Sequence, residues 1–309
     1  MTDDILIEAK HLWKRFGEKV AVEDVSLQIR AGEVYGLMGP DGAGKSTVIR
    51  LLCGAYAQDE GEVFLAGRSL TSEPDNARAN LGYLSQRFSL YSDLTVLENL
   101  RFFAEVRGIS GDDWGQRAQE TLEFVDMAEF GNRKAGALSG GMKQKLGLAV
   151  AMIHQPAILL LDEPSSGVDP VTRQAFWRLL VRLLQGGVAA LLSTPYMDEA
   201  MRCNQVGFMS EGRILLEGEP QDLTKRLKGR LLRVRGEPIR AIARIAREIP
   251  SVESVQPFGD RLHLRIAVGT EKEVTREVQK AVDNAGLHVT SIRSASPDLE
   301  DIFVDLLEQ

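Results

Sequence analysis

The chain has 309 residues, more than one typical domain needs, so we expect two domains with room for a substantial core. Hydrophobic residues make up 44% and charged residues 26%, as in soluble globular proteins, and the formal net charge of −7 argues against a dedicated nucleic-acid binder, which would be basic. The two cysteines, Cys53 and Cys203, are too few for a disulfide framework or a metal cluster and favour a reducing cytosol.

The beginning of the chain is predicted to be rich in strands. It opens with Met1-Thr2-Asp3-Asp4, acidic where a secretory signal carries positive charge, so no signal peptide is expected. Apolar runs at 5–9, 25–29 and 34–38, separated by glycines and polar turns, predict three strands. Phe16, between the first two runs, is a candidate platform for a purine base, although an aromatic residue near a turn more often belongs to the core.

The stretch 39–47 fits the pattern G-x-x-x-x-G-K-[ST] between a predicted strand and a helix predicted over 45–53. In that setting glycines let successive backbone N–H groups converge on phosphate oxygens, and the helix N-terminus adds about half a positive charge. The lysine then reaches the outer phosphates, and the following hydroxyl is offered to Mg²⁺. The predicted phosphate cradle consists of Gly39, Pro40, Asp41, Gly42, Ala43, Gly44, Lys45, Ser46 and Thr47.

Helical segments then interrupt the pattern of strands. A capping box at Thr95 opens a helix that runs to Val106, and 114–127 has the apolar spacing of a second helix. The segment Ser139-Gly140-Gly141 begins a third helix, whose N-terminus is a second candidate anion site. We therefore expect a helical insert over about 87–153.

A pair of carboxylates follows an apolar run of five residues. Residues 157–161 have the length of a buried strand rather than of a membrane span. Asp162 and Glu163 stand at the carboxyl end of that strand, where open α/β sheets bind ligands. A helix capped by Asp169 comes next, and residues 1–228 together are predicted to form one α/β nucleotide-binding domain.

From residue 229 the pattern changes to that of a small α+β domain. The order of elements is βαββαβ, which is typical of the ferredoxin-like (split βαβ) fold, and an acidic helix follows. Residues 229–309 are therefore predicted to be a separate C-terminal domain. The expected strands are 231–235, 252–258, 261–268 and 288–293, and the expected helices are 239–249, 271–285 and 298–307.

Several motifs, in order, resemble those of the ATP-binding cassette (ABC) family. Leu138–Gln144 resembles its signature, Ile158–Pro164 its Walker B strand and Ser165–Asp169 its D-loop, while Gln86 stands where the Q-loop is expected. With the phosphate loop, the resemblance covers roughly residues 5–220. It implies a P-loop NTPase cassette with a strand-rich subdomain and a helical insert, ATP and Mg²⁺ as cofactors, and an ATPase activity.

The resemblance also implies a role for each residue of the site. In-line attack on a γ-phosphate needs charge neutralisation and a positioned water more than covalent chemistry. The implied roles are adenine stacking for Phe16, phosphate binding for residues 39–47 and Mg²⁺ coordination for Ser46, Gln86 and Asp162. Glu163 and Gln86 are the implied catalytic residues, and Glu163 would polarise the attacking water.

Two cassettes of this family enclose two ATP molecules head to tail. The resemblance therefore implies that Ser139, Gly140 and Gly141 contact the γ-phosphate held by a second cassette. A dimer is expected, either of two copies of this chain or of this chain with another cassette.

A short domain after the cassette resembles the ATP-binding subunits of ABC-2-type exporters, including drug and antibiotic exporters, through Asp298–Phe303 in its final helix. The stretch Tyr196–Ala200 fits that branch too. This implies an integral-membrane permease as partner, a position on the cytoplasmic face of the cell membrane, and no nucleic-acid partner. The alternative is a soluble ABC ATPase that acts as a regulator, for example on ribosomes, although such proteins usually carry two cassettes or long coiled coils.

Two residues depart from the family pattern. Asp41 replaces the common Asn, and we expect a mild effect from one more negative charge near the phosphates. Pro195 stands where the family has a switch histidine, and proline has neither a side-chain donor nor a backbone N–H. A loss on the order of 10²-fold or more in turnover is expected at this site.

Two arrangements remain open at this stage. In the first, this chain forms a slow, mainly binding site, and its signature completes a competent site on a second cassette, in another chain or in the same one. In the second, two copies form a homodimer with two weakened but working sites, because Glu163 is kept.

Overall fold

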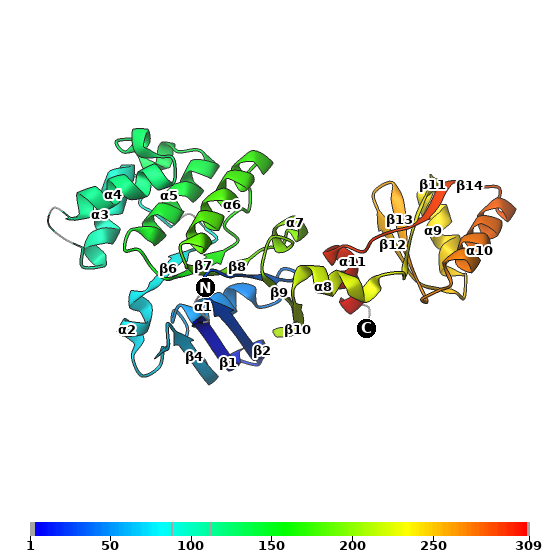
Figure 1. Cartoon of the computed structure of the whole chain (residues 1–309), viewed down its shortest axis with the longest axis horizontal. Helices are drawn as coiled ribbons and strands as arrows, with labels where there is room; N and C mark the ends of the chain where they lie inside the picture. Colours follow the sequence, from blue (N-terminus) through cyan, green and yellow to red (C-terminus); the bar gives the residue numbers. More distant parts are fainter. Residues whose placement is uncertain (1–3, 88, 110, 112, 308–309) are drawn as a thin grey trace. The chain divides into compact units, whose positions relative to one another are not determined.

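The computed structural model describes residues 4–87, 89–109, 111 and 113–307. The chain divides into two compact units, one up to Pro220 and one from Gln221 onward (Figure 1). The prediction placed this division between 228 and 229, where the strand pattern of the second domain begins. The intervening segment, α8 (Pro220–Thr224) and the 3-10 turn η3 (Lys225–Leu227), goes with the second unit, because η3 packs on α11 (Leu299–Leu307).

Two sheets form the frame of the first unit. Its described strands are β1 (Ile5–Phe16), β2 (Lys19–Arg30), β3 (Val34–Met38), β4 (Glu60–Leu65), β5 (Arg68–Ser69), β6 (Leu81–Leu84), β7 (Ile158–Asp162), β8 (Ala189–Ser193), β9 (Gln205–Ser210) and β10 (Arg213–Gly218). One sheet is antiparallel, in the order β2-β1-β4-β5. The other has the order β10-β9-β3-β8-β7-β6 and is parallel except for β10, which runs antiparallel to β9.

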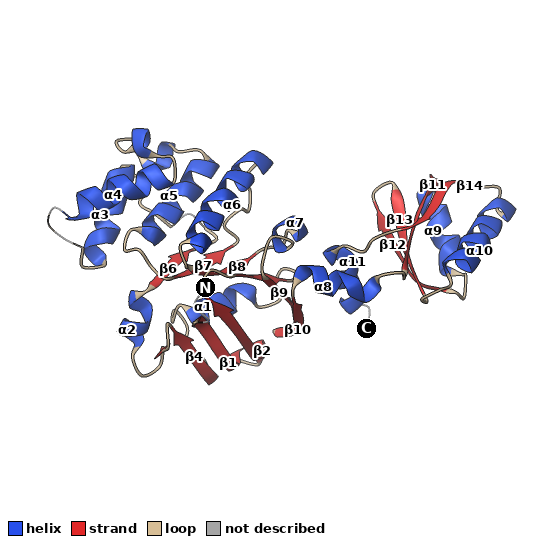
Figure 2. Cartoon of the chain, in the orientation of Figure 1, coloured by secondary structure: helices blue, strands red, loops and turns tan. Residues whose placement is uncertain are grey.

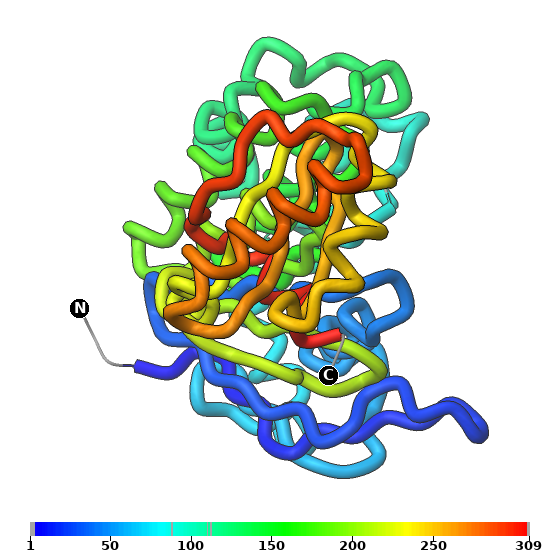
Figure 3. Tube along the Cα trace, turned by 90° about the vertical axis from the view of Figure 1, so that its right-hand side faces the viewer, coloured from blue at the N-terminus to red at the C-terminus, as the bar shows by residue number. Residues whose placement is uncertain are grey.

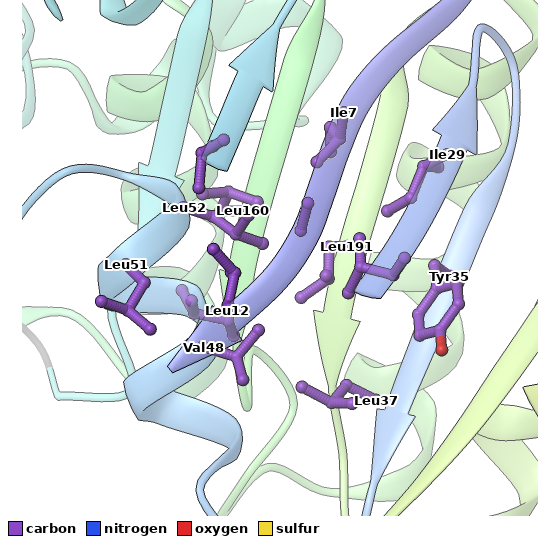
Figure 4. Packing of buried hydrophobic residues seen from close by; sticks show 14 of the residues in the cluster. Ile7, Leu12, Ile29, Tyr35, Leu37, Val48, Leu51, Leu52, Leu160 and Leu191 are labelled. Carbon is purple, nitrogen blue, oxygen red and sulfur yellow. The ribbon is translucent and has the colours of Figure 1, made fainter. Parts of the chain in front are cut away.

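The core of the first unit joins these sheets through α1 (Lys45–Leu52). Strands β3, β7 and β8 are buried along their whole length, which is why their sequences are continuous apolar runs. Leu12 of β1, Val48 of α1, Leu160 of β7 and Leu191 of β8 belong to one buried cluster (Figure 4). Each such side chain contributes roughly 1.5–3 kcal/mol by leaving water, so the cluster holds β3 and α1 firmly on either side of the loop between them.

Helices, joined by loops, complete the first unit (Figure 2). They are α2 (Pro74–Ala79), α3 (Val96–Val106), α4 (Asp113–Phe124), η1 (Ala128–Phe130), η2 (Ala135–Ala137), α5 (Gly140–Met152), α6 (Pro170–Gln185) and α7 (Met197–Ala200). The predicted capping box is confirmed, because Glu98 N donates to Thr95 Oγ1 at 3.2 Å and Thr95 N donates to Glu98 Oε2 at 2.7 Å. Helices α3, α4 and α5 pack on one another, which confirms the helical insert. Among the described residues, none of the helices combines the length and apolar character required to cross a membrane.

The second unit has the ferredoxin-like architecture that the βαββαβ pattern predicts. Its elements are β11 (Leu231–Glu237), α9 (Ile239–Arg247), β12 (Val252–Phe258), β13 (Arg261–Ile266), α10 (Glu271–Asn284) and β14 (His288–Ser294), followed by α11. The antiparallel sheet has the order β12-β13-β11-β14. Helices α9 and α10 lie side by side (Figure 3), and their apolar residues form one buried cluster with alternate residues of the strands.

Candidate functional site

A cleft of about 440 Å³ in the first unit brings most of the predicted site residues together. The predicted residues that line it are Phe16, Asp41, Gly42, Gly44, Lys45, Ser46, Thr47, Gln86 and Glu163. Lys19 and Ala21 of the β1–β2 hairpin line it as well, and they were not predicted. Gly39, Pro40 and Ala43 belong to the same loop without lining the cleft. The loop between β3 and α1 therefore shares one cleft with the residue that follows β7.

The loop requires glycine at two positions because other backbone segments pass close to it. At Gly39, φ is 150°, and an added Cβ would come within 2.1 Å of the carbonyl oxygen of Met209. At Gly44, φ is 110°, and an added Cβ would come within 2.4 Å of the carbonyl oxygen of Ala21. Gly42 has open space around it and needs glycine only for its φ of 82°. The loop is thus held in shape by β9 and β2.

Lys45 brings a positive charge to the loop. Its Nζ donates to the carbonyl oxygens of Gly39 at 2.8 Å and Pro40 at 3.0 Å, and the residue is only 5% exposed. Among the described residues, no carboxylate forms an ion pair with this ammonium group. A nearly buried lysine without a counter-ion is rare, so the charge is available to an anionic ligand.

Asp162 is buried and does not itself line the cleft, but it is bound by two hydroxyl groups, one of them on the cleft residue Ser46. Its Oδ1 accepts hydrogen bonds from Ser46 Oγ at 3.0 Å and from Ser193 Oγ at 2.7 Å. Its Oδ2 is buried and has no hydrogen-bond partner among the described residues, an arrangement that costs roughly 1–3 kcal/mol. A divalent cation would satisfy this oxygen, and a carboxylate beside a hydroxyl is the kind of oxygen donor set that Mg²⁺ takes. The residues present therefore fit the predicted Mg²⁺.

The backbone of Glu163, the residue after Asp162, is held in a sparsely populated conformation. Its φ is 48°, in the left-handed region, and its N–H donates to the carbonyl oxygen of Ser193 at 3.2 Å and to Ser193 Oγ at 2.9 Å. Gln86 Nε2 donates to Glu163 Oε2 at 2.8 Å. The structure thus places the predicted catalytic pair in direct contact, and Ser193, which was not predicted, positions both acidic residues.

Phe16 is a cleft residue rather than a core residue, because it is 46% exposed. Its ring packs edge-to-face on Tyr56, with centroids 5.4 Å apart, and Lys14 Nζ lies 5.6 Å from its centre. A ring that is supported at its edge and exposed to the cleft can stack on a flat ligand.

The signature segment lies elsewhere and does not line this cleft. Ser139 caps α5, with its Oγ accepting from Met142 N at 3.3 Å. Ser139 and Gly140 are exposed, and Gly141 packs so closely on Thr172 that a Cβ there would come within 2.4 Å of its Cγ2. The segment is therefore rigid and accessible to another molecule.

A buried acidic residue that the sequence did not single out links two loops of the site. Glu199 of α7 is fully buried, and its carboxylate accepts hydrogen bonds of 2.5 Å from Ser165 Oγ and 2.5 Å from Thr194 Oγ1. Arg173 of α6 lies 3.7 Å from the same carboxylate. Glu199 therefore ties the segment after β7 to the residue before the exposed Pro195. Nothing in the local sequence distinguishes it from the exposed Asp198 that precedes it.

Comparisons with known proteins match both units. A family described as ABC transporter matches residues 22–166, and one described as ATP-binding protein DrrA1-3-like, C-terminal domain, matches residues 218–307. The chain is 40% identical over 309 residues to the "Probable multidrug ABC transporter ATP-binding protein YbhF" of Escherichia coli (strain K12), which covers 99% of this chain and 52% of that protein. The chain thus spans about half the length of that relative.

Two further similarities cover nearly the whole of the matched protein. The chain is 33% identical over 307 residues to the daunorubicin resistance ATP-binding protein DrrA2 of Streptomyces coeruleorubidus, over 98% of this chain and 95% of that protein. Among solved structures, the dimeric ATP-binding cassette MJ0796 bound to ADP and Pi matches with a TM-score of 0.64 and 28% identity, over 69% of this chain and 98% of that one.

Proposed function

Because the chain belongs to the family of ABC transporter ATP-binding proteins, we propose that it binds ATP with Mg²⁺ and hydrolyses it to drive an export permease. The observation that carries the proposal is the buried, half-satisfied carboxylate of Asp162 beside Ser46, directly next to Glu163. A purely structural carboxylate would have partners on both oxygens. This one suits a site that gains a cation together with a phosphate.

The residues of the cleft divide the work of ATP hydrolysis. Lys45 exchanges the carbonyl oxygens of Gly39 and Pro40 for the outer phosphates. Ser46 and Asp162 would hold Mg²⁺, with Gln86 as a further ligand. The ion, when bound, neutralises charge on the phosphates.

Glu163 positions the attacking water. Gln86 occupies its Oε2, so Oε1 is left to accept a hydrogen bond from a water in line with the γ-phosphate. The left-handed conformation of Glu163, held by Ser193, keeps this carboxylate fixed beside the cleft. Phe16 would stack on adenine at the other end of the cleft.

The proposed assembly is a head-to-tail dimer of cassettes. The exposed Ser139 and Gly140 at the start of α5 do not line the cleft of their own chain, which supports a contact with the γ-phosphate bound by a second cassette. The matched structure of MJ0796 is a dimer with ADP and Pi.

An exporter of the ABC-2 type is the proposed setting, with an integral-membrane permease as partner and the cytoplasmic face of the cell membrane as location. The names of the relatives support this setting, because they are multidrug, daunorubicin resistance and linearmycin resistance ATP-binding proteins. The match of the second unit to the DrrA1-3-like C-terminal domain supports it too. The alternative, a regulator that works without a permease, has no comparable support.

Because Pro195 replaces the switch histidine, we further propose that this chain hydrolyses ATP slowly and pairs with a second cassette whose site is faster. Proline offers no donor to a γ-phosphate. Thr194, which precedes it, directs its hydroxyl to the buried Glu199 and so does not replace the missing donor. The homodimer with two weakened sites remains the rival arrangement.

Two measurements test these proposals on the full chain. ATP turnover of the purified protein is compared with that of Pro195→His, and a slow wild type that Pro195→His accelerates on the order of 10²-fold supports the asymmetric pair. Brisk wild-type turnover that the histidine leaves unchanged would sink it.

The exporter setting is tested by co-expression with a candidate permease. Retention of the chain in the membrane fraction only when the permease is present supports the proposal. Recovery of the chain in the soluble fraction whichever permease is supplied would favour the regulator.

A further inference from the structure

The second unit has a sheet face that helices α9 and α10 do not cover. Leu232 and Val234 of β11 point into the cluster formed with α9 and α10. Because successive side chains of a strand point to opposite faces, Arg233 and Arg235 project from the other face. On β14, Ile292 packs against the cluster, so Ser291 and Arg293 project to the same side as these arginines.

Helix α11 occupies only one half of this face. Asp301 of α11 contacts His263 of β13, and Asp305 of α11 pairs with Arg265 of the same strand. The half formed by β11 and β14 holds a separate groove of about 370 Å³. The groove is lined by Arg233, Arg235, Thr290, Ser291, Arg293 and Ser294.

The charges of this groove are unbalanced. Arg233 and Arg293 are directly opposite each other across the two strands, an arrangement that destabilises a sheet when the charges have the same sign. Neither arginine forms an ion pair with any residue that the structure describes. Arg235 has an exposed partner, Asp260, at 3.6 Å. No acidic side chain lines the groove, so it carries positive charge. Of its three hydroxyl groups, that of Ser294 donates to Glu271 Oε1 at 3.3 Å, which leaves those of Thr290 and Ser291 for a ligand.

One of these arginines is held in place by a buried chain of hydrogen bonds. Arg233 Nε donates to His263 Nε2 at 3.3 Å, so Nε2 acts as the acceptor of the ring and Nδ1 as its donor. That Nδ1–H donates to Asp301 Oδ1 at 2.6 Å, and both residues are buried. Burial, the largest single influence, raises the pKa of Asp301, but the interactions with His263 and Asp298 together outweigh it, and the pKa of this carboxyl lies below its ordinary value.

Asp298 completes this series of hydrogen bonds. Its N–H donates to Asp301 Oδ2 at 2.9 Å, and Asp301 N donates to Asp298 Oδ1 at 3.0 Å. Both oxygens of the buried carboxylate are thus satisfied. The guanidinium of Arg233 is therefore oriented before any ligand arrives, and its terminal nitrogens have no hydrogen-bond partner among the residues that the structure describes.

We propose that this groove binds a phosphate monoester group, carried either by a soluble compound or by a lipid. Planar guanidinium forks and hydroxyl donors match the oxygens of a phosphate dianion, and a phosphate between Arg233 and Arg293 would relieve their repulsion. A nucleic-acid strand is the less fitting ligand, because no aromatic side chain lines the groove to stack on bases. The proposal does not depend on ATP hydrolysis in the first unit.

The test uses the full chain with Lys45→Ala, which weakens phosphate binding in the first unit. The probe is inorganic phosphate, and the readout is the NMR signals of the arginine Nε–H groups. We expect a saturable shift of the signals of Arg233 and Arg293. Arg293→Gln should weaken phosphate binding by about tenfold or more, whereas Arg276→Gln, an exposed arginine of α10, should leave it unchanged.

The role of His263 and Asp301 in positioning Arg233 is tested in the same titration. Asp301→Asn removes the charge that orients His263, so in the Lys45→Ala chain it should weaken phosphate binding by a few fold. In the chain that keeps Lys45, the same substitution should leave ATP binding unchanged. Unchanged phosphate affinity in Asp301→Asn would remove the positioning role.

The source of the phosphate is decided with vesicles. Sedimentation with phosphatidylcholine vesicles that contain phosphatidic acid, but not with phosphatidylcholine alone, would identify a lipid headgroup if Arg293→Gln abolishes it. A saturable shift with inorganic phosphate and no such sedimentation would identify a soluble compound. Absence of both responses, or binding of single-stranded RNA through the same arginines without a response to phosphate, would overturn the proposal.

Discussion

The two units of this chain present positive charge to a ligand in different ways. In the first, the loop between β3 and α1 is shaped by backbone contacts, and one nearly buried lysine adds the charge. In the second, the proposed groove is made by arginine side chains on two neighbouring strands. Groups that are buried and shared among several partners cannot be changed singly without cost, whereas exposed side chains can. Changes in the first unit should therefore have larger effects than changes in the second.

The largest effect is expected from Glu163→Gln. Glutamine keeps the hydrogen-bonding shape but cannot polarise a water as a base, so ATP turnover should fall on the order of 10²- to 10⁴-fold. Binding of a fluorescent ATP analogue should persist, because Lys45 and the loop are intact. The control is Glu129→Gln, an exposed residue of η1, and turnover that survives Glu163→Gln would remove this residue from the chemistry.

A large loss of stability is expected from Glu199→Gln. The change removes the charge that faces Arg173 and weakens the hydrogen bonds from Ser165 and Thr194. The free energy of unfolding should fall by about 2 kcal/mol, measured by urea denaturation. The matched control is Asp198→Asn, on the exposed side of the same helix, which should change it little. Equal effects of the two changes would contradict the central position of Glu199.

A pair of glycine substitutions sharpens the comparison within the loop itself. Gly44→Ala places a Cβ against the carbonyl oxygen of Ala21. In Gly42→Ala the added Cβ lies in open space, and the only cost is the positive φ, which is unfavourable for alanine. ATP affinity should fall about tenfold or more in Gly44→Ala, from strain of roughly 1–3 kcal/mol, and less in Gly42→Ala. The reverse order, measured by titration with an ATP analogue, would mean that packing does not shape the loop.

The smallest effect is expected from Arg293→Gln in the second unit. Removing one of two opposed arginines should raise the stability of this unit by about 0.2–1 kcal/mol at low salt. Added phosphate should narrow this difference in stability, because it binds the wild type more tightly and therefore stabilises it more. Thermal unfolding with and without phosphate measures both effects, and a destabilised Arg293→Gln would show that the arginine pair is not repulsive.

Much of the fold and part of the site could be predicted from local patterns. The apolar runs of β3 and β7, the capping box at Thr95 and the βαββαβ order each involve residues that are close in sequence. Strands β9 and β10 were not predicted, although β9 shapes the loop through the carbonyl oxygen of Met209. The boundary between the units was placed at 228/229 because α8 and η3 have no strand pattern of their own.

The sequence by itself determined which groups form the proposed nucleotide site, because the residues from Gly39 to Thr47 are consecutive and Asp162 and Glu163 are adjacent at the end of β7. Only the tertiary structure decided which residues support them. Ser193, Glu199 and Met209 reach the site through strand pairing and helix packing, which join residues far apart in the chain. The opposition of Arg233 and Arg293 likewise depends on the register of β11 and β14, and a shift of one residue would place them on different faces.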